Sequence, residues 1–431
     1  MSDKAKHYDV LVIGAGIIGL SAAYHIKKSH RDLSVLVIDR AAAPAQGDTA
    51  KSMAGVRDTF TSDVNRLLAG SSIAFYKHVQ SELGFNLDLE LIGYLWLLTA
   101  KEFKVFETFE EAMRKQGIRI RIRIFDRKDL ATMIPDLVLD PSSEQSKLIG
   151  LDSVQKGVQG LDCGAVAPEL IAKFYENEFD KLGGEFQFGT EAKALQLDAK
   201  SKLGLPGEPY LWQEKVLRGV DTNHGNISAD TLLLAAGCRT PFLLDPVGID
   251  CHVKAKKHQI FQLRGNQLDR LMNTNQFNEQ NTIPFTILPK GVHFRPTRSE
   301  KTLWVSTAEG IGTPFSFEEE PFAEESFYTY NIHPILSEHF PCFANLRPIN
   351  SWAGLYDINS IDSTPIIDRV SNCIIAAGLS GSGIMKADAV GRMAAAVYDG
   401  REEATLFGDK KISTSRLGLT NRSVEKEKFV I

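Results

Sequence analysis

Three glycines near the start of the chain have a spacing that binds nucleotides. Gly14, Gly16 and Gly19 form a Gly-x-Gly-x-x-Gly pattern directly after the apolar run of residues 9–13. The first glycine permits a tight turn, the second lets the backbone approach a pyrophosphate, and the third lets a helix pack closely on a strand. The N-terminus of that helix presents N–H groups and a partial positive charge to the phosphates. The pattern therefore predicts a dinucleotide site.

A carboxylate stands where a ribose needs a hydrogen-bond acceptor. Asp39 ends a second apolar run, residues 33–39, and lies 20 residues after Gly19. A carboxylate at this place accepts hydrogen bonds from ribose hydroxyls, and its charge disfavours a 2′-phosphate. The alternative is a glycine-rich structural turn with a surface aspartate. At this point NAD and FAD both remain open.

The elements that must position these residues follow from the apolar pattern. Residues 9–13, a helix to about residue 28, and residues 33–39 form a strand–helix–strand unit of a parallel sheet. Near the end of the chain, residues 372–400 repeat the order of strand, glycine-rich turn and helix. Further helices are predicted at 63–82, with Asp63 as N-cap, at 101–117 and at 166–182. Further strands are predicted at 92–99, at 230–237 and within 252–310. Residues 203–214 are predicted to form a surface excursion.

Composition and charge exclude several classes of protein. The chain has 431 residues, 43% of them hydrophobic, and a formal net charge of -5. This length favours a fold with two lobes. The net negative charge provides no positive surface potential that would attract nucleic acid. The five cysteines stand singly, which argues against a metal site or disulfides and suits a reducing compartment. No apolar stretch of about 20 residues is present. We therefore expect a cytoplasmic protein, with peripheral membrane association left open.

Two more glycine turns distinguish between the dinucleotides. They are "LLLAAGCR" (232–239) and "IIAAGLSGSGIMK" (374–386). A simple NAD dehydrogenase has no need of a glycine-rich turn at the far end of the chain, whereas FAD enzymes often return one to the isoalloxazine. These segments resemble the D-amino-acid oxidase/sarcosine oxidase superfamily of FAD-dependent amine oxidoreductases. Three other segments share the resemblance: "SMAGVRDTFTSDVNRLLAGS", "GYLWLL" and "SWAGLYDI". Within this superfamily, "LGLPGEPYLWQE", "GSGIMKAD" and "NRSVEKEKFVI" are most similar to the single-subunit, FAD-only dye-linked L-proline dehydrogenases.

The resemblance implies an α/β fold in two domains. The FAD-binding domain is expected to be Rossmann-like and discontinuous, built from residues 1–54, 150–238 and 362–431. The second domain, of α+β type, is expected to carry a large antiparallel sheet and to span residues 55–149 and 239–361. Some relatives tether FAD through a histidine or cysteine near segments that here read Lys51-Ser52-Met53 and Ala353-Gly354-Leu355. The resemblance therefore implies non-covalent FAD.

The resemblance also assigns residues to FAD and to the substrate. Arg57 would bind the substrate carboxylate, Tyr356 would orient the amine or carboxylate, and Lys386 lies one place beyond a lysine that assists carboxylate binding in sarcosine oxidases. The alternatives are a structural ion pair of Arg57 with Asp58 or a distant acid, a core tyrosine, and a solvent-facing lysine. The expected FAD contacts are Gly14, Gly16, Ile17, Ile18, Gly19, Asp39, Arg40, Ser52, Met53, Ala192, Ala236, Gly237, Gly381, Gly383, Ile384, Met385 and Lys386.

The remaining aromatic and histidine residues are expected to have structural roles in the main. The backbone N–H groups of residues 381–385 are a better candidate than the Lys386 side chain to stabilise charge on reduced flavin. Tyr94 and Trp96 alternate as in ordinary sheet packing. His258 and His293 are expected to be solvated or at the edge of a core.

The activity implied is that of an FAD-dependent amine dehydrogenase. Its substrate would be a small amino acid, most of all L-proline oxidised to Δ1-pyrroline-5-carboxylate, and its electrons would pass to a quinone or another electron carrier instead of NAD. One alternative is an oxidoreductase of sarcosine or other N-methyl amino acids. Another is a non-catalytic flavoprotein that serves in assembly or electron transfer. A homo-oligomer remains open, and no metal is expected.

Overall fold

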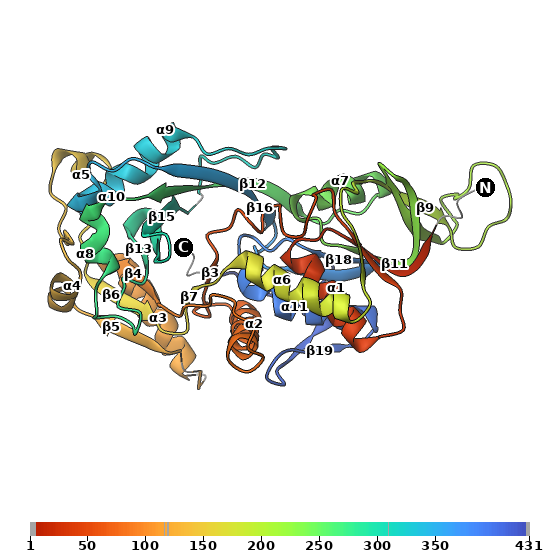
Figure 1. Ribbon diagram of the computed structural model, residues 1–431, viewed down its shortest axis with the longest axis horizontal. Helices are drawn as coiled ribbons and strands as arrows, with labels where there is room; N and C mark the ends of the chain where they lie inside the picture. The colour runs from red at the N-terminus through yellow and green to blue at the C-terminus, as the bar shows by residue number, and fades with distance from the viewer. Residues whose placement is uncertain (1–5, 116, 119, 309, 428–431) are drawn as a thin grey trace.

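Two eight-stranded sheets organise the chain. The computed structural model describes residues 6–115, 117–118, 120–308 and 310–427. Figure 1 shows an elongated molecule in which helices α1, α6 and α11 lie together beside one sheet, while the other sheet lies toward the opposite end. The expected α/β architecture with a Rossmann-like sheet and a second sheet is confirmed.

The first sheet contains the glycine turn and is mostly parallel. Its order is β17-β18-β11-β1-β2-β8, with β10 and β9 continuing from β11. β2, β1, β11 and β18 run parallel, and β1 and β2 are apolar because helices and other chain segments bury them on both faces. The strands are β1 (His7–Ile13), β2 (Val35–Ile38), β8 (Glu185–Gln187), β9 (Ala192–Ala199), β10 (Lys215–Thr222), β11 (Gly225–Leu234), β17 (Ile366–Val370) and β18 (Cys373–Ala377).

Helices α1 and α11 cover one face of this sheet, and α6 and α2 pack on them. α1 (Ile17–Ser29) packs against α11 (Gly383–Tyr398) and α6 (Pro168–Lys181), and α11 also packs against α2 (Asp63–Ser81). The predicted N-cap of α2 was wrong by one residue. Ser62 is the cap, because its hydroxyl accepts a hydrogen bond from the Asn65 N–H at 3.4 Å, and Asp63 is the first helical residue.

The second sheet is antiparallel except for one parallel pair. Its order is β16-β12-β15-β14-β13-β4-β6-β5, and only β13 and β4 run parallel among these described strands. The strands are β4 (Tyr94–Leu98), β5 (Ile122–Phe125), β6 (Lys156–Gly160), β12 (Val253–Leu263), β13 (Phe285–Ile287), β14 (Val292–Thr297), β15 (Thr302–Thr307) and β16 (Asn350–Asn359). β6 falls inside the stretch 150–238 that we expect in the FAD-binding domain, yet it pairs in this sheet between β4 and β5.

Each face of the second sheet contacts different parts of the chain. Leu95, Phe294 and Val305 pack toward helices α8 and α10. The opposite face, called the inner face below, carries Tyr94, Trp96, Phe285, Ile287 and Ile260, which cluster with Met53 from the segment before α2. Side chains alternate along each strand, so every second residue of β4, β13 and β14 reaches the inner face.

Shorter elements complete the fold. They are β3 (Gly55–Val56), β7 (Gly164–Ala165), β19 (Glu403–Thr405), β20 (Lys411–Ser413), α3 (Ala100–Lys115), α4 (Arg127–Met133), α5 (Glu144–Leu148), α7 (Thr240–Leu244), α8 (Asp269–Met272), α9 (Glu325–Phe327) and α10 (His333–His339). Single turns of 3-10 or π helix are η1 (Gly237–Arg239), η2 (Asp245–Val247), η3 (Asn266–Leu268), η4 (Pro289–Gly291), η5 (Tyr328–Ile332), η6 (Pro341–Phe343) and η7 (Thr414–Leu417). The helix predicted at 101–117 is α3, and Gln116 lies outside the described residues.

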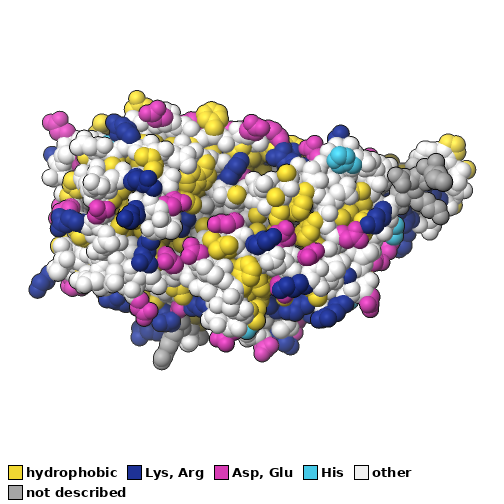
Figure 2. All heavy atoms as spheres, viewed as in Figure 1, with side chains coloured by type: hydrophobic (Ala, Val, Ile, Leu, Met, Phe, Trp, Pro, Cys, Tyr) yellow, Lys and Arg dark blue, Asp and Glu magenta, His cyan; other side chains and the backbone are white. Residues whose placement is uncertain are grey.

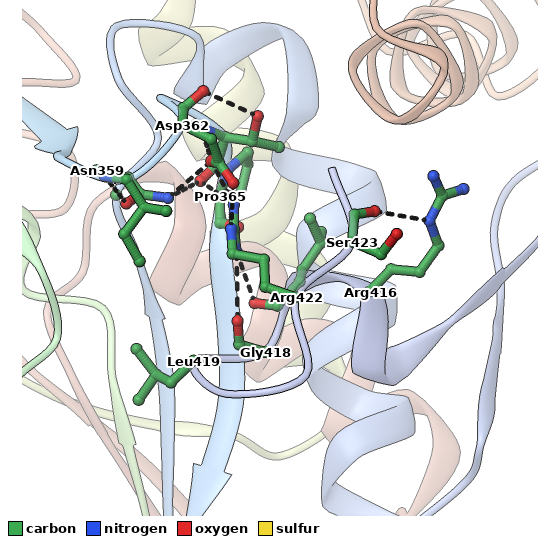
Figure 3. A network of polar contacts seen from close by, with 12 residues as sticks. Asn359, Asp362, Pro365, Arg416, Gly418, Leu419, Arg422 and Ser423 are labelled. Atoms are coloured by element: carbon green, nitrogen blue, oxygen red, sulfur yellow. Dashed lines mark hydrogen bonds and ion pairs between the residues drawn. The ribbon is translucent and has the colours of Figure 1, made fainter. Parts of the chain in front are cut away.

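The C-terminal tail is fixed to the first sheet as far as it is described. The Arg422 guanidinium forms two contacts with the Asp362 carboxylate, at 2.5 and 2.8 Å, and donates to the Thr364 carbonyl oxygen at 2.7 Å (Figure 3). Glu427 accepts hydrogen bonds from the Thr61 and Ser62 backbone N–H groups before α2. The tail is therefore held in place up to Glu427; residues 428–431 lie outside the described range.

One surface segment of the described chain exposes two large apolar side chains. The excursion predicted at 203–214 links β9 to β10 and exposes Leu211 and Trp212 to 97% and 72%. On the face drawn in Figure 2, basic and acidic side chains are interspersed without a continuous patch of one sign. In the described ranges, no helix combines the length and apolar character needed to cross a bilayer.

Candidate functional site

A cavity of about 1000 Å³ extends from the glycine turn after β1 to the turn before α11. Its walls come from the first sheet at one end and from β12 and β16 of the second sheet at the other. The predicted residues that line it are Gly14, Gly16, Ile17, Ile18, Asp39, Arg40, Ser52, Ala192, Ala236, Gly237, Gly381, Gly383, Ile384 and Tyr356. The remaining predicted residues, Gly19, Met53, Met385, Lys386 and Arg57, do not line it.

The glycine turn has the shape that the sequence predicts. Gly14 has φ of +107°, and a Cβ atom there would lie 2.4 Å from the Ala235 carbonyl oxygen. A Cβ on Gly19 would lie 1.8 Å from the Gly14 carbonyl oxygen, so Gly19 is needed for helix packing and makes no contact with the cavity. Gly16, the N-cap of α1, has no side chain to cap the helix, although Thr49 Oγ1 accepts the N–H of the first helical residue, Ile17. The backbone N–H groups at this end therefore face a site suited to phosphates.

Asp39 is fixed at the edge of the cavity. Its Oδ2 accepts the Ala15 N–H at 2.7 Å and its Oδ1 accepts the Ala41 N–H at 2.8 Å. These two bonds orient the carboxylate, which keeps further lone pairs for hydroxyl donors because a carboxylate offers about four acceptor positions. The sequence missed Thr49, whose Oγ1 accepts the Ile17 N–H at 3.1 Å and which also lines the cavity.

The opposite end of the cavity is built around a second helix N-terminus. α11 begins at Gly383, its N-cap Ser382 makes no side-chain capping bond, and Gly381 has φ of +78°. A Cβ on Gly381 would lie 2.7 Å from the Tyr356 ring, so only glycine lets this turn approach β16. A helix N-terminus at each end, a carboxylate after β2 and a cavity of this volume fit FAD. Its phosphates would lie at α1 and its electron-accepting group toward α11.

Tyr356 lies against a histidine that the sequence did not assign to the site. The Tyr356 ring stacks on His258 with centroids 4.5 Å apart, and both residues line the cavity. Ser306 Oγ donates to the Gln259 carbonyl oxygen at 2.7 Å, so it accepts from His258 Nε2 at 3.2 Å. The expectation of a solvated or core-edge His258 is therefore corrected, since strand alternation turns this residue toward the cavity.

Arg57 and Lys386 are brought together around one aromatic ring. The Arg57 guanidinium donates to the Thr59 carbonyl oxygen at 2.7 Å and lies 4.0 Å from the Phe60 ring centroid. Lys386 Nζ donates to Asn65 Oδ1 and to Ser382 Oγ, each at 2.7 Å, and lies 5.2 Å from the same ring. Both residues are buried, and no ion pair joins Arg57 to Asp58. The alternative of a solvent-facing Lys386 is therefore wrong.

Lys386 titrates near neutral pH because of its surroundings. Burial and the positive charge of Arg57 lower the pKa of Lys386 to about 7. Burial also lowers the pKa of Arg57. A buried amine near neutrality changes the charge beside the Gly381–Gly383 turn over the physiological pH range.

The Lys386→Met variant tests this shift through stability. In the wild type, folded Lys386 loses its proton near pH 7, whereas the unfolded chain keeps it to about pH 10.5. The unfolded state therefore binds more protons in this window, and the free energy of unfolding should rise with pH by up to about 1.4 kcal/mol per pH unit relative to the variant. Below pH 7 both states carry the proton and the two curves should run parallel. Urea unfolding from pH 6 to 10 measures this, with Lys104→Met as the exposed control; parallel curves throughout would contradict the shift.

Comparison with known families identifies most of the chain. The family model described as "DAO: FAD dependent oxidoreductase" matches residues 9–397. Among curated proteins, "FAD-dependent oxidoreductase domain-containing protein 1" of Xenopus laevis is 22% identical over 91% of this chain and 79% of its own length. "Sarcosine oxidase subunit beta" of Rhodobacter capsulatus is 21% identical over 85% of this chain and 78% of its own length.

Solved structures share the fold over nearly the whole chain. L-proline dehydrogenase from P. horikoshii superposes with a TM-score of 0.73 at 21% identity, covering 92% of this chain and 95% of that one. Glycine oxidase from Geobacillus kaustophilus gives a TM-score of 0.70 at 17% identity with the same coverage of both chains. At these identities the likeness establishes the common architecture.

Proposed function

The chain belongs to the DAO family of FAD-dependent oxidoreductases, and on this premise we propose that it oxidises the carbon–nitrogen bond of a small amino acid, with L-proline as the substrate. FAD is its cofactor. The observation that carries the proposal is the pair of buried basic side chains, Arg57 and Lys386, beside the turn that begins α11. A flavoprotein that serves only as a scaffold has no need of buried positive charge next to its cofactor cavity.

Each group at the site has a separate role in the proposed reaction. The buried cations attract the substrate carboxylate and hold the carbon beside the nitrogen toward the cavity. Tyr356, fixed between His258 and the Gly381 turn, borders the same end of the cavity. Bound FAD supplies the acceptor for the hydride, and the protein supplies orientation and electrostatics. Proline would lose a hydride from the ring carbon beside nitrogen that does not carry the carboxylate, and a proton from nitrogen, giving Δ1-pyrroline-5-carboxylate; the electrons would then pass to a quinone or another carrier.

The FAD is proposed to be held without a covalent bond. Residues 51–53 and 353–355 contain no histidine or cysteine. Cys238 lines the cavity, but burial raises the pKa of its thiol and keeps it in the poorly nucleophilic protonated form.

Anaerobic reduction of the purified holoenzyme tests the substrate. Adding L-proline should bleach the oxidised-flavin band near ~450 nm within seconds, while D-proline and sarcosine act slowly or not at all. Bleaching by sarcosine in preference to proline would favour an N-methyl amino-acid oxidoreductase, as the sarcosine oxidase subunit among the relatives suggests. Failure of every amine and N-methyl amino acid to bleach the flavin would contradict the proposal and favour an assembly or electron-transfer flavoprotein.

A further inference from the structure

A short segment beside the second sheet borders the opening of the FAD cavity. Residues 315–321, called the clasp below, lie in the connection between β15 and α9 and read "FSFEEEP". In Figure 1 this connection extends along β12 toward α7. Four residues of the clasp line the cavity: Phe317, Glu318, Glu319 and Pro321. One wall of the cavity is therefore a chain segment that belongs to neither sheet.

The clasp is attached to β12 of the second sheet. The Ser316 N–H donates to the Ala255 carbonyl oxygen at 2.9 Å. Lys257 forms ion pairs with Glu318 at 3.1 Å and with Glu324, just beyond the clasp, at 2.6 Å. These contacts fix the side of the clasp that faces the second sheet.

The other side of the clasp contacts the elements that follow the first sheet. The Glu319 carboxylate forms ion pairs with both Arg40 and Arg239, and both arginines line the cavity. The Phe317 ring packs edge-on against Phe242 of α7 with centroids 4.8 Å apart. The Arg239 guanidinium lies 5.2 Å from the centroid of the Phe317 ring.

The two arginines stand on either side of the glycine turn. β11, β1 and β2 are neighbouring parallel strands, so their carboxyl ends meet at the same edge of the sheet. Arg40 follows β2, Arg239 follows β11 in η1, and the turn that contains Gly14 follows β1 between them. By pairing with both arginines, Glu319 forms a bridge across the phosphate end of the cavity.

This bridge is built to open. The side chains of Glu319, Arg40 and Arg239 are 58%, 45% and 27% exposed, so water and salt weaken both ion pairs. None of the residues 310–327 is buried. A segment with few buried contacts separates locally from the rest of a protein at a small cost in free energy.

We propose that the clasp closes over bound FAD, that Glu319 holds it shut through Arg40 and Arg239, and that its opening sets the rate at which FAD leaves the protein. The attachment to β12 would keep the clasp on the second sheet while its contacts with Arg40, Arg239 and Phe242 break. This inference goes beyond the proposed function, because it concerns the cofactor and is the same for any substrate. Such a device suits a flavin that is held without a covalent bond.

Exchange of the cofactor in the holoenzyme tests the clasp without any turnover. The holoenzyme is mixed with an excess of isotopically labelled FAD, and mass spectrometry of the protein-bound flavin gives the rate at which FAD leaves. Glu319→Gln should exchange about 3- to 10-fold faster than the wild type, because two exposed ion pairs are lost.

The neighbouring glutamate provides the matched control. Glu320 is exposed, does not line the cavity and forms no ion pair with another described residue. Glu320→Gln removes the same charge one position away and should exchange within about twofold of the wild type. Equal acceleration in the two variants would overturn the proposal, since charge alone would then explain it.

Salt separates an ionic clasp from a merely structural role of Glu319. Raising NaCl from about 0.05 to about 1 M shortens the Debye length to about 3 Å. The wild-type exchange rate should therefore rise toward that of Glu319→Gln, and the difference between the two proteins should shrink. The same ratio of rates at both salt concentrations would overturn the proposal.

The remaining outcomes also decide the inference. An unchanged exchange rate in Glu319→Gln would overturn it. If Glu319→Gln is isolated without flavin, Phe317→Leu decides, because it removes the aromatic contacts with Phe242 and Arg239 and leaves both ion pairs. Faster exchange in Phe317→Leu than in the wild type supports the proposal, and an unchanged rate overturns it.

Discussion

The Gly19→Ala variant is expected to be purified with less than about a tenth of the wild-type flavin. The added Cβ would lie 1.8 Å from the Gly14 carbonyl oxygen and 3.0 Å from its carbonyl carbon, both backbone atoms. Gly14 is held in place because its N–H donates to the Ile38 carbonyl oxygen at 2.9 Å. α1 must therefore shift from β1, which misplaces the N–H groups that receive the phosphates. The ratio of flavin absorbance to protein absorbance measures the effect.

A second glycine of the same cavity provides the control. Gly47 also lines the cavity, but a Cβ there would meet nothing within 4 Å, and its φ is not in the left-handed region. Gly47→Ala should therefore keep its flavin. Full flavin content in Gly19→Ala would show that close packing of α1 on the strand is not what shapes the phosphate end of the cavity.

The Arg422→Met variant is expected to lower the free energy of unfolding by about 3–5 kcal/mol. The Arg422 and Asp362 side chains are only 7% and 11% exposed, so the change leaves a carboxylate buried without its cation. The Thr364 and Pro365 carbonyl oxygens lose their donor as well (Figure 3). Urea unfolding of the holoenzyme followed by circular dichroism measures the loss.

Arg416 in the same tail offers a matched comparison. It pairs with Asp63 at 3.0 Å, but the two side chains are 32% and 48% exposed. Solvent screens such a pair, so Arg416→Met should cost no more than about 1 kcal/mol. Equal small losses in both variants would mean that the tail does not depend on the Asp362 pair.

The cofactor end of the site could be predicted from the sequence because it is local. β1, the turn and α1 are contiguous, and Asp39 follows on the neighbouring strand. The glycine spacing therefore determines the backbone path by itself, and the structure places Gly14, Gly16 and Asp39 at the cavity. The helices at 63–82 and 101–117 were likewise predictable from periodicity, since their turns depend on neighbours three and four residues away.

The substrate end could not be predicted in the same way. Arg57 and Lys386 are far apart in sequence, and their common contact with Phe60 exists only after α2 packs on α11. The register of α11 alone does not say whether Lys386 faces solvent or the interior.

The sequence by itself thus determined the nucleotide-binding turn and the family resemblance, because these depend on residues that are neighbours along the chain. Only the tertiary structure decided the environment of the buried polar groups. Strand periodicity says that His258 alternates with its neighbours on β12, but it does not say which face of the sheet meets the cofactor. That choice depends on how the second sheet packs against the segment around Met53 and the helices behind it, which brings together residues hundreds of positions apart.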